Sequence, residues 1–243
     1  MDNKILNYNQ GQRIIYYPNT IEHMKCSVIK TVSKGSVWEK RISHRIYKDC
    51  KTNECAIDIG ANIGVHTISI LDGVSNNGFV IAFEPQKDLA KCLTETLKQV
   101  NRTNPGRMIS GNFEVSNHLV SNKNEKKLFY SDGSGRSRIP IEGDRYIKNW
   151  KKNYLQSTTL DSFLSTNKKY NNLKLPICLI KIDVEGHEFE VLEGAKNTIQ
   201  KYNPVIYIEV WENKGDLKKL INWCKLNKYK MEKLTPNDYR LYV

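Results

Sequence analysis

Three acidic side chains of the 243-residue sequence stand at or near the ends of short apolar runs. Asp58 lies in the run CAIDI, Glu84 follows FVIAF, and Asp183 follows ICLIKI. Short apolar runs of this kind indicate buried strands of a parallel sheet. Because ligands bind beyond the carboxyl ends of the strands in such sheets, we expect the three carboxylates to face one crevice.

A glycine turn follows the first of these runs. Gly60 and Gly64 flank Asn62 between the strand and a helical stretch, which is the opening of a βαβ unit. Glycine allows a tight turn and a close ligand, and the helix N-terminus offers free N–H groups. The spacing lacks the middle glycine of a dinucleotide fingerprint and the Lys-Ser or Lys-Thr of a Walker loop. Asp58 suits a cationic amine, so we interpret the turn as a cradle for S-adenosylmethionine, whose amino-acid end carries an ammonium group.

Glu84 stands at the tip of the second strand. A doubly wound fold holds ribose hydroxyls at this point, about 20 residues after the glycine turn. A carboxylate accepts two hydroxyl hydrogen bonds, which fits a ribose diol. The sequence therefore predicts that Glu84 binds the ribose of the cofactor.

The third strand is followed by Asp183, Glu185, His187 and Glu188. Such a run at a strand end is typical of a functional site, although acidic residues also favour a helix N-terminus. His187 is the predicted general base because imidazole titrates near neutral pH. Asp183 is predicted to orient the acceptor or to contact the cofactor. We expect no metal ion, although Asp183, Glu185 and Glu188 carry oxygen ligands that suit Mg²⁺.

Four motifs in this order resemble the FkbM-type S-adenosylmethionine-dependent methyltransferases. They are DIGANIG, AFEPQ, TTLDSF and LIKIDVEGHEFEVLEGA, and the resemblance extends from about residue 38 to about residue 209. It implies an α/β, Rossmann-like class I methyltransferase fold, with a seven-stranded, mostly parallel sheet and a C-terminal antiparallel hairpin. Residues 36–243 would form the S-adenosylmethionine-dependent methyltransferase domain. Residues 1–35 would form an N-terminal extension, in which Arg13–Tyr17 and Ser27–Lys30 are expected to pair as a hairpin.

The resemblance assigns further residues to the site. In the family, the segment that contains Asn117 and His118 contacts the adenine edge, and this chain departs from the usual pattern at Leu119 and Asn122. A helix predicted over residues 36–49 covers the cofactor mouth in the family and carries Glu39. The predicted cofactor-binding residues are Asp58, Gly60, Asn62, Gly64, Glu84, Asn117, His118 and Asp183.

Residues 131–156 have the least regular pattern of the chain. A loop of this kind, placed after the cofactor segment, is predicted to be a substrate lid, with a solvated insertion as the alternative. The predicted substrate contacts are Glu39, Arg136 and Glu185. In the motif TTLDSF, Asp161 is predicted to cap the short helix that follows it.

The composition narrows the class of protein. The formal net charge is +12, which can signal nucleic acid, but the lysines are scattered and form no block. The six cysteines form no C-x-x-C pair, which predicts core thiols in a reducing compartment. The N-terminus is polar, and no apolar run reaches the ~20 residues that span a bilayer. We therefore expect a cytoplasmic protein without a membrane span.

The expected reaction is methyl transfer to a hydroxyl oxygen of a sugar, a glycan or another small metabolite, because members of the family mostly methylate such groups. One alternative is an RNA 2′-O-methyltransferase with a Lys-Asp-Lys-Glu set. Lys40, Asp183, Lys196 and Glu209 have these types in order, but the intervals between the last three are too short. The other alternative is a non-catalytic adenosyl-binding module. The sequence leaves the acceptor and the oligomeric state open.

Overall fold

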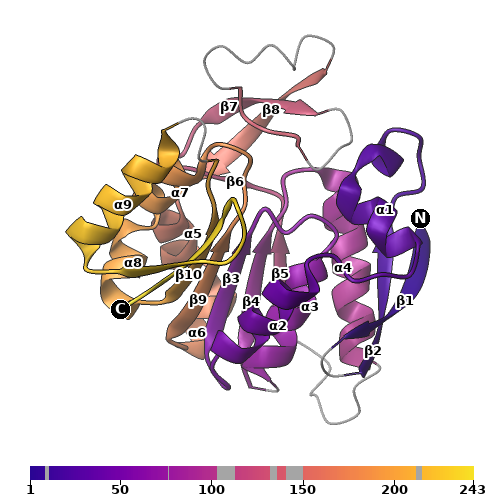
Figure 1. Ribbon diagram of the computed structural model, residues 1–243, viewed down its shortest axis with the longest axis horizontal. Coiled ribbons are helices and arrows are strands. Elements are labelled where there is room, and N and C mark those ends of the chain that lie inside the picture. The colour runs from indigo at the N-terminus through magenta and orange to yellow at the C-terminus, as the bar shows by residue number, and fades with distance from the viewer. Residues whose placement is uncertain (9–10, 76, 103–112, 132–135, 141–149, 212–214) are drawn as a thin grey trace.

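A seven-stranded sheet forms the centre of the protein in the computed structural model, which describes all residues except 9–10, 76, 103–112, 132–135, 141–149 and 212–214 (Figure 1). In spatial order the strands are β11 (Lys230–Lys233), β12 (Asp238–Tyr242), β10 (Val205–Glu209), β9 (Ile177–Ile182), β3 (Cys55–Ile59), β4 (Phe79–Phe83) and β5 (Phe113–Ser116). The strands from β10 to β5 are parallel, whereas β12 runs antiparallel to both β10 and β11. The predicted fold class, with its C-terminal antiparallel hairpin, is confirmed.

The central strands β9, β3 and β4 are buried along their whole length. Their apolar runs suit this position because both faces of the sheet are covered by helices. Side chains of consecutive strand residues point to opposite faces of the sheet, so Ala56 packs in the core on one face and Ile57 in the core on the other. Because side-chain direction alternates along a strand, a residue at the end of a strand points its side chain either into one of the two cores or toward the crevice.

Helices cover both faces of the sheet (Figure 1). One face holds α1 (Ser27–Ser33), α2 (Lys40–Asp49), α3 (Val65–Val74) and α4 (Lys87–Arg102). The other face holds α5 (Leu160–Thr166), α6 (Lys168–Leu173), α7 (Glu188–Gly194), α8 (Lys196–Tyr202) and α9 (Asp216–Asn227). Among the described residues, no helix combines the length and the apolar character needed to cross a membrane.

The N-terminal segment forms a hairpin in which the predicted strand Arg13–Tyr17 is confirmed as part of β2 (Gly11–Tyr17), but its partner is not the predicted one. Strand β1 (Asp2–Tyr8) pairs antiparallel with β2, and a short 3₁₀ helix, η1 (His23–Lys25), follows. The predicted strand Ser27–Lys30 is wrong, because this segment begins α1 and buries Ile29 on one helical face. The hairpin packs on α4, where Thr96 accepts a hydrogen bond from the backbone N–H of Tyr16 (3.0 Å). The proposed boundary at residue 35 stays a prediction.

One further local prediction differs from the structure. The helix predicted over residues 36–49 starts only at Lys40, because Glu39 adopts a left-handed conformation that cannot continue a helix.

A small second sheet lies over the carboxyl ends of the central strands (Figure 1). Its strands, in spatial order, are β6 (Leu119–Val120), β8 (Lys151–Thr158) and β7 (Lys126–Ser131). The prediction of irregular structure over residues 131–156 is therefore wrong for residues 151–156, which pair antiparallel with β7. Residues 132–135 and 141–149 of the predicted lid lie outside the described residues.

Asp161 does not cap its own helix. Thr159 performs that role for α5 by accepting a hydrogen bond from the N–H of Ser162 (3.0 Å). Asp161 instead accepts hydrogen bonds from the N–H groups of Asn197 and Thr198 (2.9 Å each), at the start of α8. The carboxylate thus supplies the cap that α8 lacks locally and joins two helices on one face of the sheet.

Candidate active site

A cavity of about 380 Å³ opens at the carboxyl ends of the central strands. Its walls come from the turns after β3, β4 and β9, the end of β10, the starts of α1 and α3, the residues just before α2, and the second sheet. This is the position at which open α/β sheets bind ligands. The predicted site residues that line it are Glu39, Gly60, Asn62, Glu84, His118, Arg136, Asp183, Glu185 and His187.

The glycine turn after β3 is as tight as its sequence predicts. Gly60 has φ +82°, and a Cβ atom there would lie 1.8 Å from the carbonyl oxygen of Asp183. Gly64 has φ +91°, and a Cβ atom there would lie 2.5 Å from Leu93 of α4. Position 60 therefore requires glycine for packing against backbone, whereas at Gly64 the positive φ favours glycine and the close atom belongs to a side chain that can move. Gly60 lines the cavity, whereas Gly64 is not among the lining residues.

The Glu84 side chain is hydrogen-bonded to the same turn. Its carboxylate accepts hydrogen bonds from the N–H groups of Asn62 (2.9 Å) and Gln86 (2.8 Å), one on each oxygen. The residue is only 4% exposed, and burial raises the pKa of Glu84 to about 7. Each carboxylate oxygen has a second lone pair, so Glu84 can still accept two hydrogen bonds from a ligand.

The two residues of the predicted adenine segment lie differently. His118 lines the cavity, and its Nδ1 is bonded to the hydroxyl of Ser116 (2.9 Å). Asn117 is not among the lining residues, and its side-chain amide donates to the backbone oxygen of Glu84 (2.6 Å). Asn117 thus holds the turn after β4 in place, whereas His118 can contact a ligand.

Asp58 is buried beneath the cavity and does not line it, so the expectation that it faces the crevice is wrong. Thr67 donates a hydrogen bond to its Oδ2 (2.6 Å), and the Nζ of Lys181 lies 3.5 Å from its Oδ1. A lysine of the protein thus occupies the position expected for a ligand ammonium. The lysine inside the apolar run ICLIKI was the sequence signal for this pair, because a buried charge requires a partner.

Lys181 also pairs with Asp183, at a distance of 3.3 Å. Burial disfavours the charged ammonium, but the carboxylates of Asp183 and Asp58 outweigh this effect and raise the pKa of Lys181. Burial opposes ionisation of Asp183 as well, but the Lys181 ammonium and a hydrogen bond from Glu209 lower the pKa of Asp183. Asp183 is therefore an ionised group at the cavity wall.

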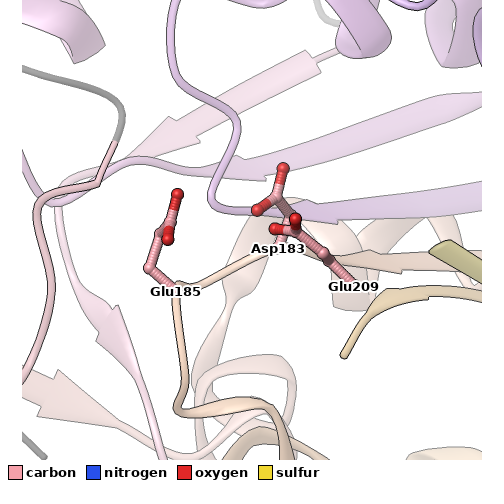
Figure 2. Close-up of side chains that lie close together, drawn as sticks. All are labelled: Asp183, Glu185 and Glu209. Carbon is pink, nitrogen blue, oxygen red and sulfur yellow. The ribbon is translucent and has the colours of Figure 1, made fainter. Parts of the chain in front are cut away.

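Glu185 and Glu209 approach Asp183, and Figure 2 shows the three carboxylates side by side. Each offers an oxygen atom, and these atoms lie within 4.8 Å of one another. Burial and the neighbouring acidic groups raise the pKa of Glu209 to about 10 and that of Glu185 to about 8. At neutral pH the cluster therefore holds protons around one ionised aspartate.

The same three oxygens form a donor set that could bind a divalent cation. Glu188, which the sequence analysis considered for Mg²⁺, lies apart from them because its carboxylate accepts a hydrogen bond from the N–H of Gly186 (2.9 Å). Glu209, at the end of β10, takes its place in the cluster. The expectation that no metal is needed stays a prediction.

His187 has hydrogen-bonding neighbours at both ring nitrogens. Its Nε2 lies 2.9 Å from the hydroxyl of Ser121, and its Nδ1 lies 3.3 Å from a carboxylate oxygen of Glu190. Burial lowers the pKa of His187, and the nearby carboxylate of Glu190 opposes this effect. The base role of His187 stays a prediction, and it would require one of these contacts to open.

Glu39 lines the cavity, as expected of a substrate contact, and its carboxylate is 3.1 Å from Nε2 of His66. His66 also lines the cavity, although sequence analysis did not select it. A histidine inside an apolar helix carries no signal of its own, since the partner is 27 residues away. The Lys-Asp-Lys-Glu alternative does not assemble here, because Lys40 and Lys196 are exposed and are not among the lining residues.

A family model described as the Methyltransferase FkbM domain matches residues 58–231, which include the glycine turn, Glu84 and the Asp183 cluster. The chain belongs to the FkbM methyltransferase family. A curated relative of this FkbM methyltransferase is the hexuronic acid methyltransferase AglP of Haloferax volcanii. The two are 27% identical over 191 residues, which cover 78% of this chain and 70% of AglP.

Solved structures show the same fold. An FkbM methyltransferase from Methylobacillus flagellatus matches with a TM-score of 0.55 and 17% identity over 81% of this chain. This chain spans only 48% of that longer protein. An O-methyltransferase from Bacillus cereus, solved in complex with SAH, matches with a TM-score of 0.50 and 11% identity over 92% of this chain and 90% of its own.

Proposed function

We propose that this FkbM methyltransferase transfers a methyl group from S-adenosylmethionine to a hydroxyl oxygen of a sugar, a glycan or another small metabolite. The proposal rests on one observation: a single cavity is lined by Glu84 and the glycine turn on one part of its wall and by the Asp183 cluster on another. The names of two similar proteins support it, since one is a hexuronic acid methyltransferase and the other an O-methyltransferase in complex with SAH.

The residues on the Glu84 side fit the cofactor. The free lone pairs of Glu84 suit ribose hydroxyls, and Gly60 and Asn62 bring backbone to the cavity wall. His118, which also lines the cavity, would contact the adenine edge. S-adenosylmethionine would supply an electrophilic methyl group on a sulfonium. The chain itself has only to hold the acceptor oxygen in line and to accept its proton.

The remaining part of the cavity would bind the acceptor. Asp183 would orient the acceptor and contact the cofactor, and Glu39, Glu185 and Arg136 would contact acceptor hydroxyls. Carboxylate and guanidinium groups both form hydrogen bonds with sugar hydroxyls, so this lining suits a polyhydroxylated molecule. We retain a cytoplasmic location as part of the proposal.

Cofactor binding by the purified chain is the direct test. We expect calorimetry to show S-adenosylhomocysteine binding with an affinity of the order of micromolar and no binding of NAD, because the turn lacks a dinucleotide cradle. Labelled S-adenosylmethionine, offered with glycans, RNA and lipids extracted from the source, should then label the glycan fraction. Binding of NAD without S-adenosylhomocysteine would overturn the proposal, label in RNA would favour the nucleic-acid alternative, and binding without transfer would favour the adenosyl-binding module.

Glu84→Gln is expected to weaken cofactor binding about tenfold or more. Hydrogen bonds to a charged group contribute about 1.5–3 kcal/mol, and the amide offers only one acceptor oxygen to the ribose. The dissociation constant of S-adenosylhomocysteine, measured by calorimetry, provides the check. Glu114→Gln is the matched control, because Glu114 lies on the neighbouring strand β5, outside the cavity lining, and bonds to Asn167. Equal affinities of a folded Glu84→Gln variant and the wild type would place the ribose elsewhere.

A further inference from the structure

Glu39 has an unusual backbone conformation directly before α2. Its φ and ψ angles are 44° and 50°, in the left-handed region. For a residue other than glycine this conformation is unfavourable, and it persists only where the surroundings impose it. Such residues are often found at active sites, and here the conformation belongs to a residue of the cavity wall.

The carboxylate of Glu39 is held by a buried histidine. Nε2 of His66 lies 3.1 Å from Oε2 of Glu39, and Nδ1 of His66 lies 3.0 Å from the hydroxyl of Ser43. The His66 side chain is 9% exposed and that of Glu39 is 34% exposed, so the pair runs from the α2–α3 interface to the open cavity. If Ser43 donates to Nδ1, the ring carries its proton on Nε2 and donates it to Glu39.

One oxygen of Glu39 remains available. Within the described part of the chain, Oε2 bonds to His66, whereas Oε1 has no hydrogen-bond partner. Electrostatic interactions connect Glu39 with Lys181 and Asp238, and His66 with Asp183. Glu39 and His66 therefore face the same space as the proposed acceptor-binding groups.

The acidic and imidazole groups of the segment after β9 already have partners within the protein. Asp183 is paired with Lys181, which weakens it as a base. Glu209 shares a hydrogen bond with Asp183, and both ring nitrogens of His187 have partners. A general base must reach the proton that it removes and must have a free lone pair. Glu39 belongs to the cavity wall, and its Oε1 has no hydrogen-bond partner within the described residues.

We propose that Glu39 is the group that accepts the proton of the acceptor hydroxyl, and that His66 is the positioning residue that holds its carboxylate. The inference rests on the proposed methyl transfer. In that reaction a lone pair of the acceptor oxygen forms the new bond to the methyl carbon, and the methyl–sulfur bond breaks. The electron pair of the broken bond stays on sulfur, whose positive charge is neutralised. The hydroxyl proton passes to Oε1 of Glu39 and is later released to water.

Glu39→Gln tests the base directly. The amide keeps an oxygen for the His66 contact but cannot accept the proton, so we expect kcat to fall about 10²-fold or more. The KM for the acceptor and the calorimetric affinity for S-adenosylhomocysteine should change less than about threefold, because binding contacts persist. Glu39→Asp, which restores a carboxylate, should regain part of kcat. Glu95→Gln, on the exposed face of α4, is the matched control and should behave as the wild type.

His66 is tested by a separate pair of variants. His66→Phe removes the hydrogen bond to Glu39 and should lower kcat about tenfold with unchanged cofactor affinity, whereas His66→Gln, which keeps a side-chain N–H donor, should recover part of the loss. Nitrogen NMR of labelled histidines gives a readout without turnover. Glu39→Gln should shift the ring-nitrogen resonances of His66, assigned as the signals missing from His66→Gln.

The outcomes separate the two proposals. Near-normal kcat of folded Glu39→Gln, or His66 nitrogen resonances that do not respond to it, overturns the role of Glu39. A 10²-fold loss of kcat in His187→Ala together with normal turnover of Glu39→Gln assigns the base to His187 instead. Absence of both cofactor binding and methyl transfer in the wild type overturns the proposed function itself, whatever the NMR spectra show.

Discussion

Gly60→Ala is expected to lower the free energy of unfolding by about 3 kcal/mol or more. The new Cβ would lie 1.8 Å from the carbonyl oxygen of Asp183, and φ of +82° is unfavourable for alanine. The contact is with backbone, so no rotamer change can relieve it. The turn after β3 and the end of β9 would have to separate. Urea unfolding, followed by circular dichroism, measures the loss.

Gly215→Ala is the control for this variant. Gly215 also has a positive φ, +75°, but a Cβ atom there meets nothing within 4 Å. We expect a loss of only about 1 kcal/mol, which is the cost of the left-handed conformation alone. If both variants lose the same free energy of unfolding, the contact between Gly60 and Asp183 adds nothing to the cost of the left-handed backbone conformation.

Asp183→Asn is expected to lower kcat/KM about 10²-fold or more and to weaken cofactor binding as well. Asp183 is the ionised member of its acidic cluster and faces the cavity, where it would orient the acceptor and contact the cofactor. Misplacement of a reacting group by about 1 Å can cost 10²-fold in rate. The fold should persist, because Lys181 keeps its second partner, Asp58. Turnover with labelled cofactor and calorimetry with S-adenosylhomocysteine measure the two effects.

Asp216→Asn is the matched control for Asp183→Asn. Asp216 also forms an ion pair with a lysine, Lys219, but lies at the start of α9, outside the cavity lining. It should leave kcat/KM unchanged. Full activity of Asp183→Asn would show that neither the charge nor the orientation of this side chain matters for transfer.

Much of the architecture could be predicted because it depends on local patterns. The runs around Asp58, Glu84 and Asp183 are apolar on both faces, so they indicate central parallel strands, and the glycine turn indicates the first βα unit. The rule that ligands bind beyond strand ends then places Glu84 and Asp183 at one cavity. The structure confirms this placement for both residues.

Elements without a strong local pattern were predicted less well. Ser27–Lys30 has the β-branched residues of a strand but forms the start of α1, because burial of Ile29 and Val32 decides its conformation. The start of α2 depends on Glu39, whose left-handed conformation accompanies a contact with α3. Tertiary packing can override local preference where that preference is weak.

The type of sheet, the glycine turn and the acidic residues at the strand ends can be derived from the amino-acid sequence, because each depends on neighbours within a few positions. Which side chains meet depends on how the strands and helices pack. The tertiary structure pairs Asp58 with Lys181, adds Glu209 to Asp183 and Glu185, and joins Glu39 to His66. These partners come from different strands and helices, so their distances depend on how the elements pack and not on spacing along the chain. The same packing decides which carboxylates are ionised, because burial and neighbouring charges set their pKa values.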